Sequence, residues 1–483
     1  MTSDLEADLC LEMSLKHERR QAVVEELQGV LMGDPRRAAR ALVLAERLAH
    51  SPGKSIPQAM MDDAEVDGAY RHLSSEHITP EKILLPHVEK TLARVQEAGL
   101  AYAVHDTTEC TFGGEKKRSG LGPVNGRDQG FLAHLTLAVS AKGERKPLGL
   151  LAVGTRVRKS VGQPTGVESH KWELGIMHSS RGLPTEALIH VADRESDIFA
   201  LLARCSAENR RFIFRAAQDR AVLTKELGEQ TVSRLFAVAR AAEPLIQVEA
   251  DISARRAGGR PPKEIRRFPV RRARTASLAY SAMSIEVKRP AKAKKDEGLP
   301  ESVKLNIVRA WEPSPPEGEQ PIEWILLTSE PIGTQEDVQR IVEGYRTRWL
   351  IEEYNKALKS GCAYEQAQLE TAHSLLNLFG YCVVIAYVLL LTRALSRAKE
   401  QLPASTFFTP AQIACLHALS RRRKVSADPT LEEALLACAG LGGHMKRNGL
   451  PGWQTLSRGY ALLLEYERGY LLGRRNPSTC AES

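Results

Sequence analysis

The sequence lacks the cysteine spacing of a disulfide-rich or zinc-binding protein. It has eight cysteines in 483 residues, with no CxxC pair and no metal-ligand spacing. It also lacks a signal peptide, and disulfides form mainly in secreted chains. We therefore expect a reduced cytoplasmic setting. The scattered cysteines are Cys10, Cys110, Cys205, Cys362, Cys382, Cys415, Cys438 and Cys480.

No apolar run in the sequence is long enough to span a membrane. The longest one, residues 378–391, has fourteen residues and contains Gly380. Because a membrane-spanning helix needs about 20 apolar residues, we expect a buried helix here and no membrane partner. The chain also has no internal repeat.

What the chain does have is length and an uneven charge. Its 483 residues, 43% apolar and 26% charged, predict a soluble protein of about two to four domains. The net charge is +8, yet residues 255–295 hold fourteen Lys or Arg against two acids, so the rest of the chain is net negative. Such a segment either attracts polyanions or is a disordered solubilising loop. Strand-like runs at 245–252 and 277–287 argue against full disorder.

Residues 1–84 are predicted to be helical. The run GDPRRAARALVLAERLA has apolar residues at helical spacing, and Asp34 followed by Pro35 is a helix start. Small basic helices at a terminus are typical of a DNA-reading module, and solvated arginines on a surface helix are the equally available alternative. The basic residues concerned are Arg36, Arg37, Arg40, Lys54 and Arg71.

The middle of the chain predicts a mixed α/β sheet of ribonuclease H type. Three strand-like runs suggest an antiparallel meander, and a strand, a helix and a further strand follow them. The expected elements are 100–106, 130–140, 147–157, 184–193, 196–208 and 211–217. Residues 222–330 then read as a β-rich insertion containing the basic segment. The expected domains are a helical DNA-binding domain (1–84), a catalytic domain (85–385) and a helical carboxy-terminal domain (386–483).

The most informative stretch is EGYRTRWLIEEYNKALK, residues 343–359. It has no Pro and many helix formers, so the sequence predicts one helix. At about 3.6 residues per turn, one side of that helix carries a carboxylate, three cations and a phenol, which suits a metal beside a phosphodiester. A solvated face with i,i+4 ion pairs is an equal alternative. The five side chains are Tyr345, Arg348, Glu352, Lys356 and Lys359.

Two strand ends carry aspartates that suit the same site. Asp106 lies in VHDTTE and Asp193 in VADRE, each after an apolar run. Together with Glu352 they would offer hard oxygen ligands for two Mg²⁺ or Mn²⁺ ions, which support phosphodiester displacement. A single aspartate at a strand end is more often a turn or cap residue. The competing acids are Glu109, Glu195, Asp197 and Glu353.

At this point the sequence resembles a known family. The spacing Y-(2)-R-(3)-E-(6)-K, from Tyr345 to Lys359, resembles the signature of bacterial DDE transposases of the transposon Tn-five type. GDPRRAAR, SPGKSI and GAYRHL resemble the end-binding domain of that group. DTT, DRESDI, RFIFR and EWILLTSEP resemble its catalytic core, and GLGGHMKRNGLPGWQTLSRGYALL resembles its dimerisation region. These blocks are collinear from about residue 30 to 470.

The resemblance implies a cut-and-paste transposase, acting as a homodimer on transposon ends and target DNA in a bacterial cytoplasm. The implied catalytic and metal-binding residues are Asp106, Asp193 and Glu352. Those implied to grip phosphates near the scissile bond are Tyr345, Arg348, Lys356, Lys359 and Arg215. Trp324 would stack on a flipped base. The residues matching end-binding positions are Arg36, Arg37, Arg40, Lys54 and Arg71.

The sequence also departs from that family. The interval from Asp193 to Glu352 is longer, mainly through the basic insertion, and residues 400–430 do not align. His50 and Pro57 stand where a basic and a hydroxyl residue are expected, so the base-reading contacts would differ. Two alternatives to a transposase are a catalytically silent DNA-binding inhibitor derived from one, and a structure-selective nuclease on the same fold.

Overall fold

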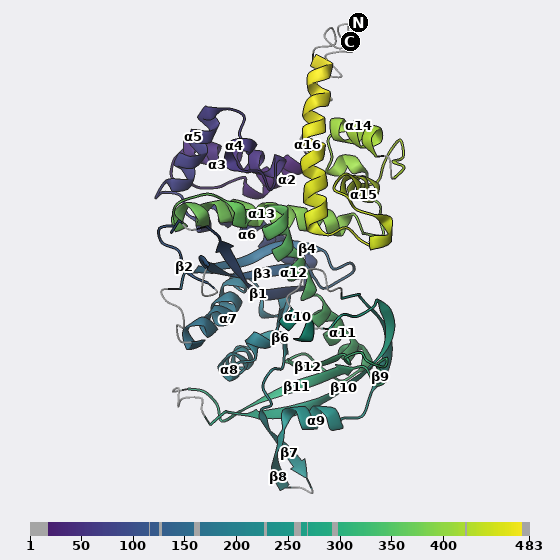
Figure 1. The fold of residues 1–483 in the computed structure, drawn as a ribbon. Coiled ribbons are helices and arrows are strands. Elements are labelled where there is room, and N and C mark those ends of the chain that lie inside the picture. Colours follow the sequence, from purple (N-terminus) through teal and green to yellow (C-terminus); the bar gives the residue numbers. More distant parts are fainter. Residues whose placement is uncertain are drawn as a thin grey trace. The chain divides into compact units, whose positions relative to one another are not determined.

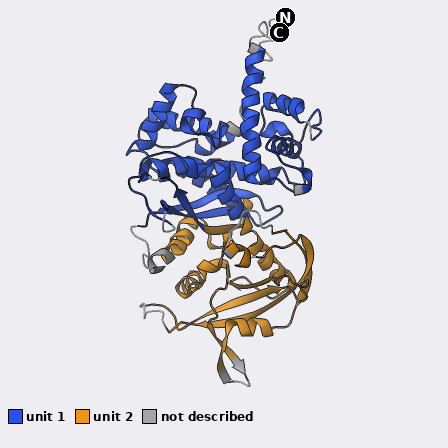
Figure 2. Ribbon diagram, viewed as in Figure 1, with its two compact units in different colours: residues 1–97, 107–163, 350–483 blue, residues 98–106, 164–349 orange. Residues whose placement is uncertain are grey.

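The computed structural model is a mixed α/β protein with amino-terminal helices, a mixed sheet and carboxy-terminal helices (Figure 1). It describes residues 18–114, 116–124, 128–158, 165–226, 229–255, 262–267, 269–291, 298–420 and 423–475. Contacts divide the chain into two units, shown in Figure 2. Unit 1 comprises residues 1–97, 107–163 and 350–483, and unit 2 comprises residues 98–106 and 164–349. The three expected domains stay a prediction.

The amino-terminal helices of unit 1 follow the sequence pattern. The second of them begins where predicted, because the Asp34 carboxylate accepts a hydrogen bond from the Arg36 backbone N–H (2.7 Å) and Pro35 fills the first turn. Its apolar face buries Ala41, Leu44, Ala45, Leu48 and Ala49. The helices are α2 (Glu18–Leu27), α3 (Pro35–His50), α4 (Ile56–Ala59), α5 (Asp63–Ser74) and α6 (Pro80–Ala98).

A long apolar helix, α13 (Ala372–Leu395), forms the core of unit 1. It packs against α2, α3, α5 and β4. By length and composition alone it is the one described helix that could cross a membrane, but 83% of its apolar window is buried inside the protein. The predicted buried helix is therefore present, and it is longer than the fourteen-residue run that indicated it.

The strands of unit 1 form an antiparallel hairpin beside the second half of β1. β3 pairs with β4 from Leu132 opposite Arg156 onward. Gly130 in β3 lies so close to β1 that a Cβ there would be 1.9 Å from the Cys110 carbonyl oxygen, so this close approach of the two strands requires glycine. The strands are β1 (Ala101–Phe112), β2 (Gly122–Pro123), β3 (Gln129–Ser140) and β4 (Pro147–Arg156).

The carboxy-terminal part of unit 1 is helical, as predicted. α16 packs against α14 and α15, and capping boxes begin α14 at Thr409 and α15 at Thr430. The elements are α12 (Trp349–Lys356), a π-turn (Ala357–Gly361), η4 (Tyr364–Gln366), η5 (Ala404–Thr406), α14 (Pro410–Leu419), α15 (Leu431–Leu441), η6 (Lys446–Asn448) and α16 (Trp453–Arg475).

Unit 2 is built on a mixed sheet with the strand order β1-β5-β6-β12-β11-β10-β7-β8, in which β9 also pairs with β10. β1, β5 and β6 are parallel, whereas β12 pairs antiparallel with β6 and the pairings among β7–β12 are antiparallel. Phe212, Phe214 and Leu327 pack against Leu202 of α8 in its core. The predicted β-rich segment 222–330 accordingly holds most of β7 and all of β8–β12. Part of the basic segment, namely 256–261, 268 and 292–295, lies outside the described residues.

The strands of unit 2 after β1 are β5 (Leu188–Ala192), β6 (Arg211–Arg215), β7 (Ala221–Glu226), β8 (Glu229–Arg234), β9 (Ile246–Ile252), β10 (Arg274–Lys288), β11 (Ser302–Trp311) and β12 (Glu323–Thr328). Its helices are α7 (Thr165–Ser179), η1 (Thr185–Ala187), η2 (Arg194–Ser196), α8 (Phe199–Ala207), α9 (Leu235–Ala241), α10 (Pro262–Arg267) and α11 (Gln335–Arg346).

The single helix predicted over 343–359 is wrong. α11 ends at Arg346, α12 begins at Trp349, and residues 357–361 form a π-turn. The Thr347 hydroxyl donates to the Gly344 carbonyl (2.5 Å), and the Thr347 and Arg348 backbone N–H groups bond three residues back instead of four. A threonine that bonds its own preceding turn tightens and interrupts a helix.

Candidate functional site

The two predicted aspartates lie at the same level of neighbouring parallel strands in unit 2. β1 pairs with β5 up to Val104 opposite Val191. Continuing both strands by two residues brings Asp106 level with Asp193, which follows β5 directly. Both carboxylates are half-buried. Two carboxylates on adjacent strands can act on one substrate atom.

Asp106 does not end its strand, contrary to the prediction. β1 continues to Phe112, because the residues after Asp106 are the β-branched and aromatic types that favour strands. Asp106 is therefore held from both sides by the strand, which fixes its backbone more firmly than a loop would.

Asp193 is both a strand end and a cap. Its Oδ1 accepts a hydrogen bond from the Glu195 backbone N–H (3.0 Å) and begins the short helix η2. Asp193 is thus a helix-cap residue, as one of the two sequence interpretations predicted. It orients the carboxylate without burying it, so a second role for the same side chain is compatible with the geometry.

A group of cations and an aromatic ring lies around Tyr345 in unit 2, near Asp193. Tyr345 is buried, and burial raises the pKa of its phenol while Arg348 and Arg215 oppose that rise. Burial also lowers the pKa of Arg215, whose guanidinium donates to the Glu323 carbonyl (3.1 Å). Asp193 and Tyr345 are close enough for their charges to interact. Four predicted site residues thus come together.

Trp324 in β12 packs edge-to-face against Tyr345, with ring centroids 5.3 Å apart. It is half-buried. An indole that keeps some exposure is able to stack on a nucleic-acid base.

The competing acids of unit 2 have structural partners. Asp197 is buried, forms an ion pair with Arg220 (2.6 Å) and accepts hydrogen bonds from the Ala217 and Gln218 N–H groups (both 2.7 Å). Glu195 pairs with Lys171 (3.0 Å). Asp197 is thereby committed to holding the loop after β6, which favours Asp193 as the functional acid.

In unit 1, the two adjacent glutamates of α12 have different surroundings. Glu353 accepts hydrogen bonds from Lys356 Nζ (2.8 Å) and Trp453 Nε1 (3.1 Å) and pairs with Arg393 (2.9 Å). These cations hold the pKa of Glu353 below its usual value against the effect of burial. Glu352 is half-buried on the same helix. The partners of Glu353 give that residue a structural role.

Two lysines of the predicted stripe are engaged within unit 1. Lys356 is exposed and paired with Glu353, as above. Lys359 donates to the Glu109 carbonyl and pairs with Glu365 (3.2 Å), which also accepts from the Thr111 N–H (2.9 Å). Lys359 therefore ties the π-turn to β1, a role that the sequence did not predict.

No three His, Cys, Asp or Glu side chains within the described ranges are grouped as ligands of one metal ion. Asp106 and Asp193 are a pair in unit 2, and Glu352 belongs to unit 1. Carboxylate pairs suit Mg²⁺ by chemistry, but a pair is not a complete ligand set. The predicted three-residue metal site stays a prediction.

The predicted DNA-contacting residues lie on the amino-terminal helices. Arg36, Arg40 and Arg71 are exposed. The Arg40 guanidinium extends from α3 across α5, where a Cβ on Gly68 would be 1.6 Å from Arg40 Nη1. Lys54, in the loop before α4, pairs with Glu465 (3.2 Å). Arg37 is half-buried at the start of α3.

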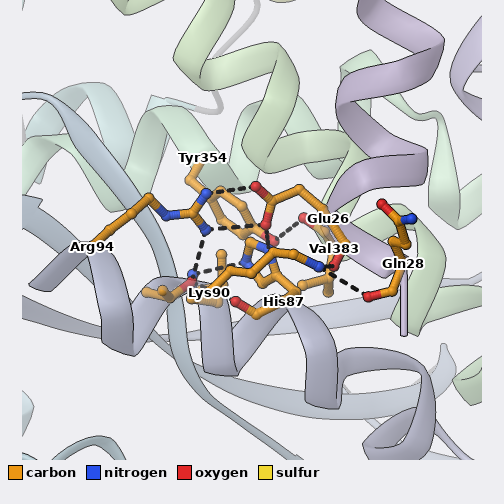
Figure 3. Close-up of polar contacts among 9 residues, drawn as sticks. Glu26, Gln28, His87, Lys90, Arg94, Tyr354 and Val383 are labelled. Atoms are coloured by element: carbon orange, nitrogen blue, oxygen red, sulfur yellow. Dashed lines mark hydrogen bonds and ion pairs between the residues drawn. The ribbon is translucent and has the colours of Figure 1, made fainter. Parts of the chain in front are cut away.

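A buried polar cluster anchors these helices to the rest of unit 1 (Figure 3). Glu26 of α2 accepts from His87 Nδ1 (2.5 Å) and from both terminal nitrogens of Arg94 (2.5 and 3.0 Å). The Leu150 N–H of β4 donates to His87 Nε2 (3.0 Å), so His87 is neutral with its proton on Nδ1. Despite burial, which acts the other way, bonds from His87 and Arg94 lower the pKa of Glu26 to about 2. No motif in the sequence indicated this cluster.

Comparison with known families bears on these helices. Residues 19–78 match the family model of the transposase DNA-binding domain. The match spans α2 to α5 and includes Arg36, Arg37, Arg40, Lys54 and Arg71. It indicates a transposase-type DNA-binding domain and supports DNA as a partner of this chain.

Proposed function

We propose that the chain is a DDE transposase of the YREK group, typified by transposon Tn-five. It binds the terminal inverted repeats of its element and catalyses metal-dependent strand cleavage, hairpin formation and strand transfer. The observation that carries the proposal is the level placement of Asp106 and Asp193 on β1 and β5, in a chain with a transposase-type DNA-binding domain.

The topology supports a ribonuclease H-like core. Three parallel strands, β1, β5 and β6, are adjacent in the sheet, and α8 connects the last two. The antiparallel hairpin β3–β4 follows β1 and the two-residue strand β2 in the chain. The predicted strands and the helix α8 occur in the predicted order, with α7 as an unpredicted helix between β4 and β5 and with β7–β12 as the insertion.

The proposed catalytic residues are Asp106, Asp193 and Glu352. With two Mg²⁺ or Mn²⁺ ions bound, such a site activates an attacking oxygen and stabilises the leaving one. Water, and later a 3′-hydroxyl of DNA, would serve as nucleophile, so no side chain is modified. The carboxylates would orient the reacting phosphodiester.

The cations beside Tyr345 would hold the substrate. Arg215 and Arg348 place guanidinium groups near the buried Tyr345, and a guanidinium fork binds phosphate oxygens in a bidentate manner. Trp324 offers its half-exposed ring to an extruded base. Lys356 and Lys359 are proposed as further phosphate contacts, once their present partners are exchanged. Two copies of the chain would pair two ends, each bound by α2–α5.

A cleavage assay tests the proposal. The substrate is a duplex carrying the inverted repeats that flank the gene, with Mg²⁺ or Mn²⁺ present. We expect Asp106→Asn, Asp193→Asn and Glu352→Gln each to lower the rate by roughly a thousandfold or more while binding persists. Glu195→Gln is the matched control, because Glu195 pairs with Lys171 at the surface. Retained nicking by Glu352→Gln contradicts the assignment, and a wild-type chain that binds but never cuts indicates a silent DNA-binding protein.

A further inference from the structure

The candidate site does not use the basic segment of the sequence, yet parts of that segment meet in unit 2. Arg255 and Arg271 form an antiparallel β-bridge beyond the paired ends of β9 and β10. Each backbone N–H donates to the carbonyl of the other residue (2.8 and 2.9 Å). In such a hydrogen-bonded pair the side chains leave on the same face, with Cβ atoms roughly 5 Å apart. Two arginines are therefore held side by side.

The surroundings of this bridge are positively charged. Arg272 is exposed next to Arg271, and Arg274 begins β10. Arg274 is bound by two carboxylates, Glu312 and Glu319, the latter at 2.9 Å. Burial, then the charges of Arg255 and Arg274, lower the pKa of Arg271, and the two glutamates only partly offset this. Arg255 and Arg274 thus lie near Arg271, together with the two glutamates.

The hydrogen bonds of the Arg271 side chain do not neutralise its charge. Its Nε and Nη2 donate to the Ser253 carbonyl (3.3 and 3.1 Å), which is a neutral acceptor. This contact fixes the guanidinium without neutralising it. Like charges placed opposite each other on neighbouring strands destabilise a hairpin. An anion bound between them would remove that repulsion, and a phosphodiester matches the guanidinium fork.

We infer that Arg255 and Arg271 form a binding site for the phosphate backbone of duplex DNA, separate from the candidate catalytic residues. The inference rests on the proposed function, which makes DNA the substrate. Contacts to phosphates carry no sequence information, so the site holds DNA of any sequence. It would add to the affinity provided by the amino-terminal helices and would make binding more sensitive to salt.

The test compares two double variants of the full chain. Arg255→Gln with Arg271→Gln removes the bridge charges, and Arg210→Gln with Arg289→Gln is the control. The control arginines lie in unit 2 and face carboxylates, Arg210 pairing with Glu208 (3.2 Å) and Arg289 with Glu301. Binding of random-sequence duplexes is measured by fluorescence anisotropy in EDTA over a range of salt concentrations.

We expect the bridge variant to show a slope of log affinity against log salt that is shallower by about 2, because each phosphate contact contributes about 0.9. At about 0.1 M salt this corresponds to an affinity loss of tens of fold, equal on unrelated sequences. The control should parallel the wild type. The thermal midpoint should stay or rise, since the backbone bridge remains and the repulsion is gone.

An unchanged slope would overturn the inference, as would a loss confined to one DNA sequence. A lowered thermal midpoint would give the two arginines a structural role instead. Binding in EDTA needs no cleavage, so the result is independent of the catalytic assignment. A chain that cleaves DNA but keeps its salt slope would refute the arginine site alone.

Discussion

Carboxylates four residues apart in unit 2 have different tasks because their neighbours differ. Asp197 is buried, with a charged partner and two backbone N–H donors. Asp193 is half-buried and caps η2 through one oxygen. Saturated acceptors leave Asp197 no lone pair directed at a substrate, whereas a capping carboxylate keeps acceptor capacity. Local partners, more than residue type, decide which acid is available for chemistry.

Asp197→Asn should destabilise unit 2 strongly. The change leaves Arg220 buried opposite a neutral amide, and breaking a buried pair costs about 3–5 kcal/mol. The measurement is the free energy of unfolding in urea. Asp219→Asn is the control, because Asp219 is an exposed acid that accepts from the Phe236 N–H (2.9 Å). Equal, small losses in both variants would contradict a structural role for Asp197.

Glu26 should make the anchoring of the amino-terminal helices sensitive to acid. Its pKa in the folded chain is about 2, below the ordinary value of 4.5. Its charged form therefore contributes stability that is fully present above about pH 4.5 and is lost as pH falls toward 2. The contribution is on the order of 3 kcal/mol. Unfolding of the wild type and Glu26→Gln, followed across this range, should show a difference that narrows in acid. A difference independent of pH would contradict the assignment.

At the scale of elements, helix α12 is tied to the carboxy-terminal helices. Glu353 of α12 bonds Trp453, the first residue of α16, and Arg393 of α13 stacks on that indole at 4.8 Å. Burial lowers the pKa of Arg393 to about 10, a sign that it is well removed from water. The helix that carries Glu352 is therefore positioned by residues about 40 and 100 positions later in the chain.

Trp453→Phe should test this tie. The change keeps a ring under Arg393 but removes the N–H donor to Glu353, at a cost of about 1–2 kcal/mol. On the proposed function, we expect the cleavage rate to fall while DNA affinity is unchanged, because α12 moves but the amino-terminal helices do not. Cleavage rates and binding isotherms are compared with those of Gln454→Ala, an exposed neighbour. Parallel loss of affinity and rate would indicate general unfolding instead.

Elements with strong local signals could be predicted from the sequence. The cap at Asp34 and the strands β3 and β4 appear near their predicted positions. The break at Thr347 was not predicted, because it depends on the Thr347 hydroxyl bonding a backbone carbonyl instead of solvent. α7 was missed because its sequence is only weakly amphipathic. The strand continuing past Asp106 was missed because an acid was taken as a strand end.

The candidate site was likewise only partly predictable from the sequence. Tyr345, Arg348 and Asp193 were predicted from motifs, and they do come together in unit 2. The contacts of Glu353 with Trp453 and of Lys359 with the Glu109 carbonyl could not be predicted, since they join segments far apart in the chain. A motif identifies the candidate residues, whereas tertiary packing determines which of their charged groups are available to a substrate.

At the scale of the whole molecule, DNA recognition and chemistry are assigned to different residues of one chain. The transposase-type DNA-binding match covers residues 19–78, whereas the proposed catalytic acids lie between 106 and 352. The positive balance of the chain is concentrated in a third segment, 255–295. Affinity and cleavage should therefore be separable by mutation.

Arg40→Ala and Glu352→Gln should show that separation. Arg40 is exposed on α3, so its loss should weaken DNA binding and reduce the salt slope by about 1. With DNA at saturating concentration, the cleavage rate of this variant should approach that of the wild type. Glu352→Gln should behave in the opposite way, binding normally and failing to cut. Both are measured on one duplex by anisotropy and single-turnover cleavage. If Arg40→Ala stayed slow at saturation, recognition by α3 would have to be coupled to the chemical step, and the division of tasks along the chain would be refuted.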